Sequence, residues 1–146
     1  MERFEVNFIK LDKDACVPTR GTDQSAGADL YSVEEIEIKK GETKLIHTGL
    51  AMEIPEGYGG FIFARSGLAT KKGLAPANKV GVVDSDYRGE IMVSLHNHSS
   101  ENQIVAKGER VAQLVFLPYA AAKFVEVESL SETERGEGGF GSTGTK

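Results

Sequence analysis

Alternation of apolar and polar residues with a period of two is the feature that most constrains the fold of this chain. Ile36 and Ile38 alternate with charged neighbours, and residues 91–95 and 125–127 repeat the pattern. Glycine and proline residues, such as those at 55–60, separate these short runs. Short alternating segments divided by turns predict an all-β fold, either a sandwich or a barrel.

Three other segments add detail to this prediction. Residues 44–54 predict one longer strand, and residues 110–117 are apolar on both faces, which indicates a central strand. Residues 66–72 are the one segment typical of a helix, with Ser66 as its cap and Gly73 as its end. The expected fold is therefore all-β with one short helix.

Composition limits the classes of function. The chain has 146 residues, the length of one domain, and a net charge of −5. This charge argues against non-specific binding of nucleic acid or anionic membranes, which needs a basic face, but it leaves an anionic small ligand open. No apolar run is long enough for a membrane span. Cys16 is the single cysteine, which favours a reducing compartment. We expect a cytoplasmic protein, or a nuclear one in a eukaryotic host.

The last residues change in character. A β domain is expected over 1–130, and residues 131–146, "SETERGEGGFGSTGTK", are rich in glycine and carry no core pattern. Such a terminus is commonly disordered. Arg135 and Phe140 within the glycine frame favour a second interpretation, because exposed main-chain N–H groups suit a phosphate cradle. We expect a mobile arm.

The stretch "GVVDSDYRGEI", residues 81–91, places acids, an aromatic and a base between two apolar runs. An Asp at a hairpin turn commonly bonds the local backbone, and a tyrosine there commonly packs. Taken alone, Asp84 and Tyr87 are therefore turn residues, with Asp86 and Arg88 as turn and salt-bridge support.

Three further polar positions have two interpretations each. In "ARSGLA", residues 64–69, Arg65 and Ser66 precede a short helix, where they suit either an anion or simple capping. Asp29 is an acid at the start of a strand. Gln113 lies in an apolar strand, where a buried amide needs a partner, and it serves either the structure or a site.

The histidines and the cysteine do not indicate a site. His47, His96 and His98 lack the spacing of zinc ligands, and "HNHSS" is typical of an exposed turn. Cys16 has no histidine nearby in the sequence, so we do not expect a catalytic thiol.

Five stretches taken together carry more information than any one of them. "AGADLYS", "ARSGLA", "GVVDSDYRG", "GERVAQLVF" and "RGEGGFGSTG" occur in this order. In this order they resemble the motifs of the homotrimeric dUTP pyrophosphatase (dUTPase) family, over about residues 8–144. The resemblance implies a jelly-roll-like, distorted β-barrel or sandwich, and a trimer with sites shared between subunits. It also implies hydrolysis of dUTP to dUMP and pyrophosphate, which keeps uracil out of DNA and supplies dUMP for dTTP synthesis.

The same resemblance assigns roles around the nucleoside. Asp84 corresponds to the carboxylate that takes a proton from the water attacking the α-phosphorus. Tyr87 corresponds to the ring under the deoxyribose that leaves no room for a 2′-hydroxyl, and Asn78 to the amide that reads uracil. The remaining members of the uracil slot are Gly81, Val82, Val83 and Met92.

The resemblance also assigns the triphosphate and its ion. Arg65, Ser66 and Gly67 correspond to a neighbouring subunit's phosphate motif, and Gln113 to a glutamine on the phosphate side. Asp29 corresponds to the acid that holds Mg²⁺ through its water shell. The arm would bring Arg135 to the γ-phosphate and Phe140 over the uracil, and close over the phosphates with Gly141, Ser142 and Thr143.

Two positions depart from the family pattern. Ala64 stands where a proline usually precedes Arg-Ser-Gly-Leu, and Ala28 stands where a large aromatic is more common. The proline mainly stiffens the backbone, so Ala64 is expected to affect rate more than function.

Three other functions compete with this one. dCTP deaminases share the fold but carry a second serine and a further arginine where Gly67 and Leu68 stand, and they use a glutamate for deamination. A catalytically silent binding relative would lack Asp84 or Phe140, and a plain structural module would not need the five motifs. Release of pyrophosphate from dUTP separates these classes.

Overall fold

The computed structural model describes residues 1–145, so the last residue of the predicted arm, Lys146, lies outside the described residues. The described part is almost entirely β, as predicted. It contains one helix, α1 (Ser66–Lys72), and the following strands: β1 (Asn7–Lys10), β2 (Ala28–Tyr31), β3 (Ile36–Ile38), β4 (Thr43–His47), β5 (Leu50–Glu53), β6 (Tyr58–Phe63), β7 (Leu74–Pro76), β8 (Gly81–Val83), β9 (Met92–Asn97), β10 (Gln103–Val105) and β11 (Arg110–Pro118).

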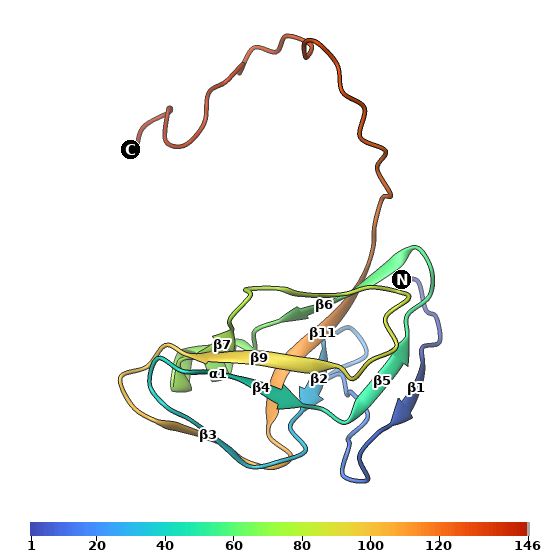
Figure 1. The fold of residues 1–146 in the computed structure, drawn as a ribbon, viewed down its shortest axis with the longest axis vertical. Helices are drawn as coiled ribbons and strands as arrows, with labels where there is room; N and C mark the ends of the chain where they lie inside the picture. Colours follow the sequence, from blue (N-terminus) through green and yellow to red (C-terminus); the bar gives the residue numbers. More distant parts are fainter. Residues whose placement is uncertain (146) are drawn as a thin grey trace.

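The strands form antiparallel sheets that pack around one core (Figure 1). The largest sheet has the order β2-β11-β6-β8, and a second has the order β4-β9-β7. β11 therefore lies between two neighbours, which confirms the central strand predicted for residues 110–117. β1 pairs with β5, and β3 with β10, in two smaller sheets.

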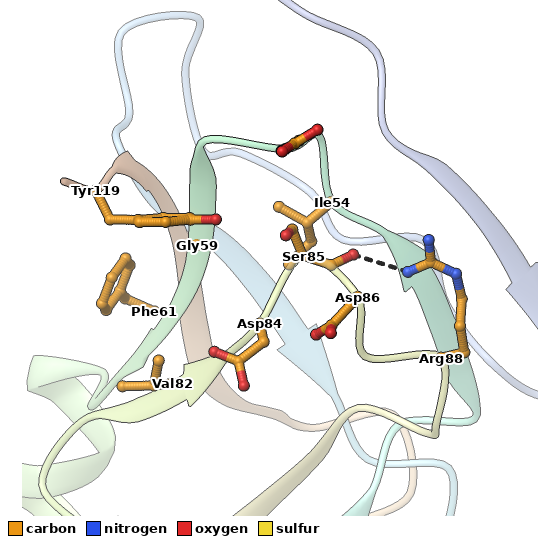
Figure 2. A pocket seen from close by; sticks show the side chains of 10 residues that line it. Ile54, Gly59, Phe61, Val82, Asp84, Ser85, Asp86, Arg88 and Tyr119 are labelled. Carbon is orange, nitrogen blue, oxygen red and sulfur yellow. Dashed lines mark hydrogen bonds between the residues drawn. The ribbon is translucent and has the colours of Figure 1, made fainter. Parts of the chain in front are cut away.

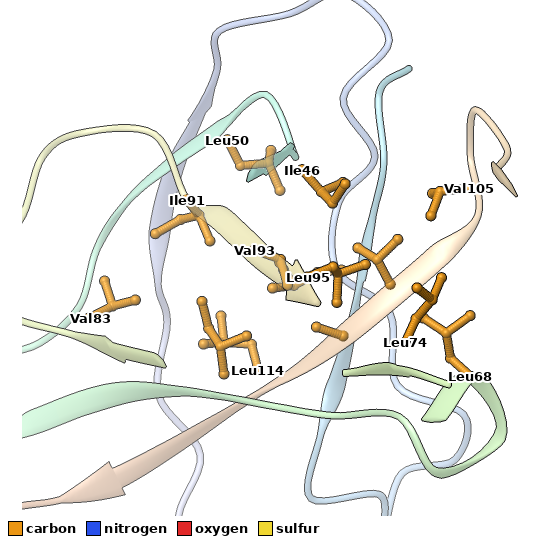
Figure 3. Close-up of a cluster of buried hydrophobic side chains, with 14 of the residues drawn as sticks. Ile46, Leu50, Leu68, Leu74, Val83, Ile91, Val93, Leu95, Val105 and Leu114 are labelled. Atoms are coloured by element: carbon orange, nitrogen blue, oxygen red, sulfur yellow. The ribbon is translucent and has the colours of Figure 1, made fainter. Parts of the chain in front are cut away.

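The core lies between the two larger sheets. Leu114 of β11 and Val83 of β8 belong to one buried cluster with Ile46, Val93 and Leu95 of the second sheet (Figure 3). Side chains on the opposite face of the large sheet are less buried: Val82 is 64% exposed. Register places Val115, Phe61 and Val82 side by side on that outer face.

The single strand predicted for residues 44–54 is wrong. The chain turns at Thr48-Gly49, and the two halves, β4 and β5, pair with β9 and β1 respectively. Gly49 has a φ of 68°, which a strand does not accommodate and which favours glycine. A side chain at this position would also collide with Asp12 and Ala15.

The predicted helix is confirmed, but its predicted cap is not. Arg65 occupies the N-cap position with extended backbone and no side-chain cap bond, and Ser66 is the first helical residue. Gly73 ends the helix in the left-handed conformation with a φ of 67°, as predicted.

Two other sequence interpretations are wrong. Residues 125–127 alternate in polarity but form no strand within the described part of the chain, where Val125 is 70% exposed. In the predicted "HNHSS" turn, Asn97 belongs to β9 and is fully buried. Its amide donates to the carbonyl oxygens of Ile38 and Glu101, so it fixes the following turn.

The chain leaves the body after β11. Tyr119 N–H donates to the carbonyl of Gly57, and the segment beyond it runs away from the sheets (Figure 1). The sequence placed the arm at residues 131–146, and from here on the name covers the described residues 120–145. No helix in the described residues is long and apolar enough to cross a membrane.

Candidate active site

The segment from Asp84 to Ile91, called here the acidic turn, connects the two larger sheets. Tyr87 N–H donates to the carbonyl of Asp84 at 3.1 Å, which closes the turn, and Arg88 Nη1 donates to the carbonyl of Ser85 at 2.8 Å. Arg88 Nε also lies 3.8 Å from Glu53, which confirms its predicted supporting role. The predicted hairpin is wrong, because β8 pairs with β6 while β9 pairs with β4 and β7.

The carboxylate of Asp84 borders an open pocket of about 690 Å³ (Figure 2). Strand alternation explains its direction: Val83 is buried in the core, whereas Val82 and Asp84 point to the outer face. Phe61 and Tyr119 form an apolar wall of the same pocket. The acid is therefore held on a rigid strand end and accessible to a ligand.

Tyr87 is held within the acidic turn and does not line this pocket. Its hydroxyl donates to the carbonyl of Glu90 at 2.9 Å, and its ring lies against Gly89, where a side chain would collide with it. The ring is 41% exposed, so part of its face is available to a ligand.

The other predicted members of the uracil slot lie around β8 and at the start of β9. Asn78 is exposed in the loop before β8, close to Gly81, which is buried. Met92 is partly buried as the first residue of β9. Of the predicted nucleoside residues, Val82 and Asp84 line the pocket, whereas the others lie on the neighbouring segments around it.

A second group forms around Asp29. Its Oδ1 accepts a hydrogen bond from Arg65 Nε at 2.8 Å, and its Oδ2 lies 3.4 Å from Arg110 Nη1. Gln113 pairs in register with Asp29 and Phe63, and its Nε2 donates to the carbonyl of Ala64 at 2.8 Å. Gln113 therefore has a structural partner, and it also lies beside the acid. We call Asp29, Arg65, Arg110 and Gln113 the arginine–aspartate cluster.

Arg110 is a member of this cluster that sequence reasoning missed. It lies in "GERVAQLVF", at a strand position that carries no core side chain. The sequence signal that could have identified it is a positive charge at the start of an otherwise apolar strand. A pocket of about 520 Å³ adjoins it, lined also by Lys71 and Lys72. Ser66 and Gly67 are exposed beside this pocket, at the start of α1.

The two groups lie far apart in one chain. Val83 pairs with Gly60, so Asp84 is level with Gly59 at the beginning of β6, whereas Arg65 follows the end of that strand. Gly59 and Arg65 are six residues apart along extended chain, which corresponds to about 20 Å. One chain therefore does not bring Asp84 and Arg65 to a common point.

The arm is separate from both groups. Arg135 Nε donates to the carbonyl of Gly138 at 2.7 Å, and Ser142 N–H donates to the carbonyl of Gly139. Among the described residues, the hydrogen bonds formed by the arm stay within it. Phe140 is fully exposed, and it adopts a positive φ of 51°.

The described residues hold no cluster of three or more His, Cys, Asp or Glu side chains arranged for a metal. The two guanidinium groups occupy both oxygens of Asp29, which disfavours direct contact with a cation. A Mg²⁺ ion usually keeps several waters and binds through one or two carboxylates and substrate phosphates. Asp29 therefore fits contact with the ion through water, provided that the phosphates supply direct ligands.

The two departures from the usual motifs are accommodated. Ala64 contributes its carbonyl to Gln113, and proline would offer the same acceptor. Ala28 pairs with Leu114 at the edge of the large sheet and is partly buried.

Comparison with known proteins agrees over nearly the whole chain. A family model described as dUTPase matches residues 13–144. The deoxyuridine 5'-triphosphate nucleotidohydrolase of Nautilia profundicola is 55% identical over 97% of this chain and 99% of the relative. That of Desulfitobacterium hafniense is 49% identical, covering 97% of this chain and 96% of the relative.

A solved structure gives the same result for the fold. The dUTPase of Staphylococcus bacteriophage 80alpha, a G164S mutant with dUpNHpp, superposes with a TM-score of 0.91 at 30% sequence identity. The match covers 97% of this chain and 99% of the phage protein.

Proposed function

The chain belongs to the dUTPase family, and from that premise we propose how its residues hydrolyse dUTP to dUMP and pyrophosphate. The observation that carries the proposal is the division of its polar residues into two groups. The acidic turn carries a carboxylate and an aromatic ring suited to a nucleoside. The arginine–aspartate cluster carries cations suited to phosphates.

Asp84 acts as the general base. Its carboxylate takes a proton from a water molecule, and the water oxygen forms a bond to the α-phosphorus. The bond from that phosphorus to the bridging oxygen breaks, and pyrophosphate leaves with the oxygen. A positioned base of this kind contributes about 10²–10⁴-fold to a rate.

The acidic turn and β8 select the nucleoside. The ring of Tyr87 packs against the deoxyribose, where a 2′-hydroxyl would collide with it. Asn78 and the main chain at 81–83 read the edge of uracil, with Met92 beside them. Cytosine is rejected because its exchanged donor and acceptor would leave buried groups unpaired.

The arginine–aspartate cluster and the start of α1 bind the phosphates. Arg65 and Arg110 supply positive charge, and Ser66 and Gly67 supply exposed donors. The side-chain amide of Gln113 is the remaining group on the phosphate side of the site. Mg²⁺, when bound, neutralises triphosphate charge, and Asp29 would hold its water shell.

We propose that two copies of the chain combine these groups, and that the protein is a homotrimer. A triphosphate is too short to extend over the about 20 Å between Asp84 and Arg65 of one chain. The outer face of the large sheet, with Phe61 and Val82, supplies apolar surface for contact between copies. A fully active monomer by light scattering would contradict this.

The arm completes the site from a third copy. Arg135 binds the γ-phosphate, Phe140 covers the uracil, and residues 141–143 close over the phosphates. The exposure of these residues and the absence of hydrogen bonds from the arm to the described body support a segment that orders only on a ligand. A cytoplasmic location fits the exposed, unpaired thiol of Cys16.

The test is nucleotide profiling of the full-length chain. Pyrophosphate release is measured with dUTP, dTTP, dCTP and UTP, each with and without Mg²⁺. Of the four nucleotides, we expect only dUTP to give pyrophosphate, and we expect Mg²⁺ to make this release faster. Ammonia release from dCTP would indicate a deaminase, and binding without turnover would indicate a silent relative.

A further inference from the structure

Glu90 connects the acidic turn to the corner between β4 and β5. Its Oε1 accepts a hydrogen bond from Gly49 N–H at 2.9 Å, and its Oε2 lies 2.8 Å from His47 Nδ1. The Glu90 side chain is 22% exposed, so water competes little for these contacts. One carboxylate thus fixes a turn to a corner 41 residues earlier in the chain.

Hydrogen bonds also hold the main chain of Glu90 and of the next residue, Ile91. Its carbonyl accepts the hydroxyl hydrogen bond of Tyr87, and the next N–H, of Ile91, donates to the carbonyl of Leu50 at 2.7 Å. The hydroxyl of Thr48 donates to the carbonyl of Ile91. The acceptor that orients the Tyr87 ring is therefore placed by the β4–β5 corner.

We propose that Glu90 is a positioning residue for the ring of Tyr87, and that it thereby controls discrimination between dUTP and UTP. The inference rests on the proposed function, in which this ring excludes the 2′-hydroxyl. The carboxylate holds the main chain of residue 90, and its carbonyl holds the phenol. Loss of the carboxylate removes one of the contacts that hold this carbonyl, so the ring can shift over Gly89 and space opens at C2 of the sugar.

The experiment compares kcat/KM for dUTP and for UTP in full-length variants. Glu90→Ala should lower the dUTP:UTP ratio about tenfold, since a small displacement of a positioning group costs up to about 10²-fold. Glu90→Gln should retain most of the ratio, because its amide oxygen still accepts from Gly49 N–H. Tyr87→Phe should lower the ratio similarly, because it removes the phenol and keeps the ring.

A double-mutant cycle separates positioning from stability. If Glu90 acts through the phenol, Glu90→Ala with Tyr87→Phe lowers the ratio no further than the larger single effect. Glu42→Ala is the matched control: its carboxylate also holds a turn, accepting from Lys39 N–H at 2.8 Å near Lys44, but away from the site. It should leave the ratio unchanged.

The outcomes distinguish two failures. A wild-type chain that does not hydrolyse dUTP overturns the proposed function. An unchanged ratio in an active Glu90→Ala variant, or additive effects in the cycle, overturns the positioning role alone. If Glu90→Ala does not fold, His47→Ala with and without Tyr87→Phe gives the same readout. It removes one of the two anchors and should lower the ratio about threefold, within the cost of a misplaced positioning group.

Discussion

The β body and the arm differ in what orders them. In the body, Leu30, Ile38 and Val111 are fully buried, and strands far apart in sequence share hydrogen bonds. In the arm, Phe124 is 95% exposed, and hydrogen bonds connect residues only a few positions apart. Ordering one residue costs about 1–2 kcal/mol of backbone entropy. The body offsets that cost by burial, whereas the arm buries little in the free chain, and we propose that a ligand or another copy of the chain orders it.

The largest expected effect tests whether a residue of the body, Asp84, is the general base. Asp84→Asn should reduce turnover of dUTP by about 10²–10⁴-fold, because the amide does not accept the proton of the attacking water. Nucleotide binding and the melting temperature should remain near those of the wild type, since Asp84 is exposed. Steady-state kinetics and calorimetry check both parts. Turnover close to wild type would contradict the assignment of the base.

The second prediction separates folding from closure. Leu114→Ala should lower the free energy of unfolding by about 2–5 kcal/mol, because it leaves a cavity in the core. Phe140→Ala should leave the melting temperature unchanged and lower turnover, because the ring is exposed in the free chain. Thermal and urea unfolding give the comparison. A large loss of stability in the Phe140 variant would mean that the arm packs in the free protein.

A chain that ends at Thr133 tests the arm as a whole. We expect an intact trimer with a nearly unchanged melting temperature. Turnover should fall roughly 10²-fold, because the site is no longer closed and the phosphates are less precisely aligned. Binding of dUMP should change less, because dUMP lacks the terminal phosphates that Arg135 is proposed to contact. Full activity of the truncated chain would make residues 134–146 a dispensable end.

The smallest expected effect is a pH dependence within the body. The hydrogen bond to Glu90 raises the pKa of His47, the charges of Glu90 and Glu34 add to this, and partial burial opposes it. A raised pKa in the folded state means that the pairing stabilises fully below the unfolded value of about 6.5, and that this contribution disappears as pH rises through the raised pKa.

The measurement is the difference in melting temperature between wild type and His47→Gln. It should be largest near about pH 6 and shrink towards about pH 8. The arm variants should show the wild-type profile. A difference that grows with pH would mean that the histidine is bound in its neutral form.

The fold was predictable wherever a strand had a local pattern. The apolar run at 110–117 indicated a central strand, and β11 does lie between β2 and β6, while Gly73 marks the end of α1. The break at Gly49 was missed because a left-handed turn leaves no mark in hydrophobic alternation. The pattern at 125–127 was misleading because a strand needs a partner edge, and alternation does not supply one.

Less of the candidate site than of the fold was predictable from the sequence. The order of the five motifs proposed its members and implied a site shared between subunits. The distance between Asp84 and Arg65 within one chain was not predictable, because it depends on strand register rather than on sequence distance. Arg110 and Glu90 were not predicted, because their places depend on contacts with Asp29 and with Gly49 that no sequence pattern shows. The sequence pattern records the types of residues, whereas the partners of a side chain depend on topology.

The path of the acidic turn between two sheets has a consequence for hydrogen exchange. The amide of Ile91 bonds to β5 and lies between the sheets, so its proton exchanges with solvent only when the whole body opens. The amides of Gly138 and Ser142 bond only within local turns and should exchange almost as fast as in a free peptide. Asp84, the proposed catalytic acid, stands at the other end of the segment that Ile91 fixes to the body. We therefore expect its position to persist far longer than any local structure of the arm, the segment proposed to close over it.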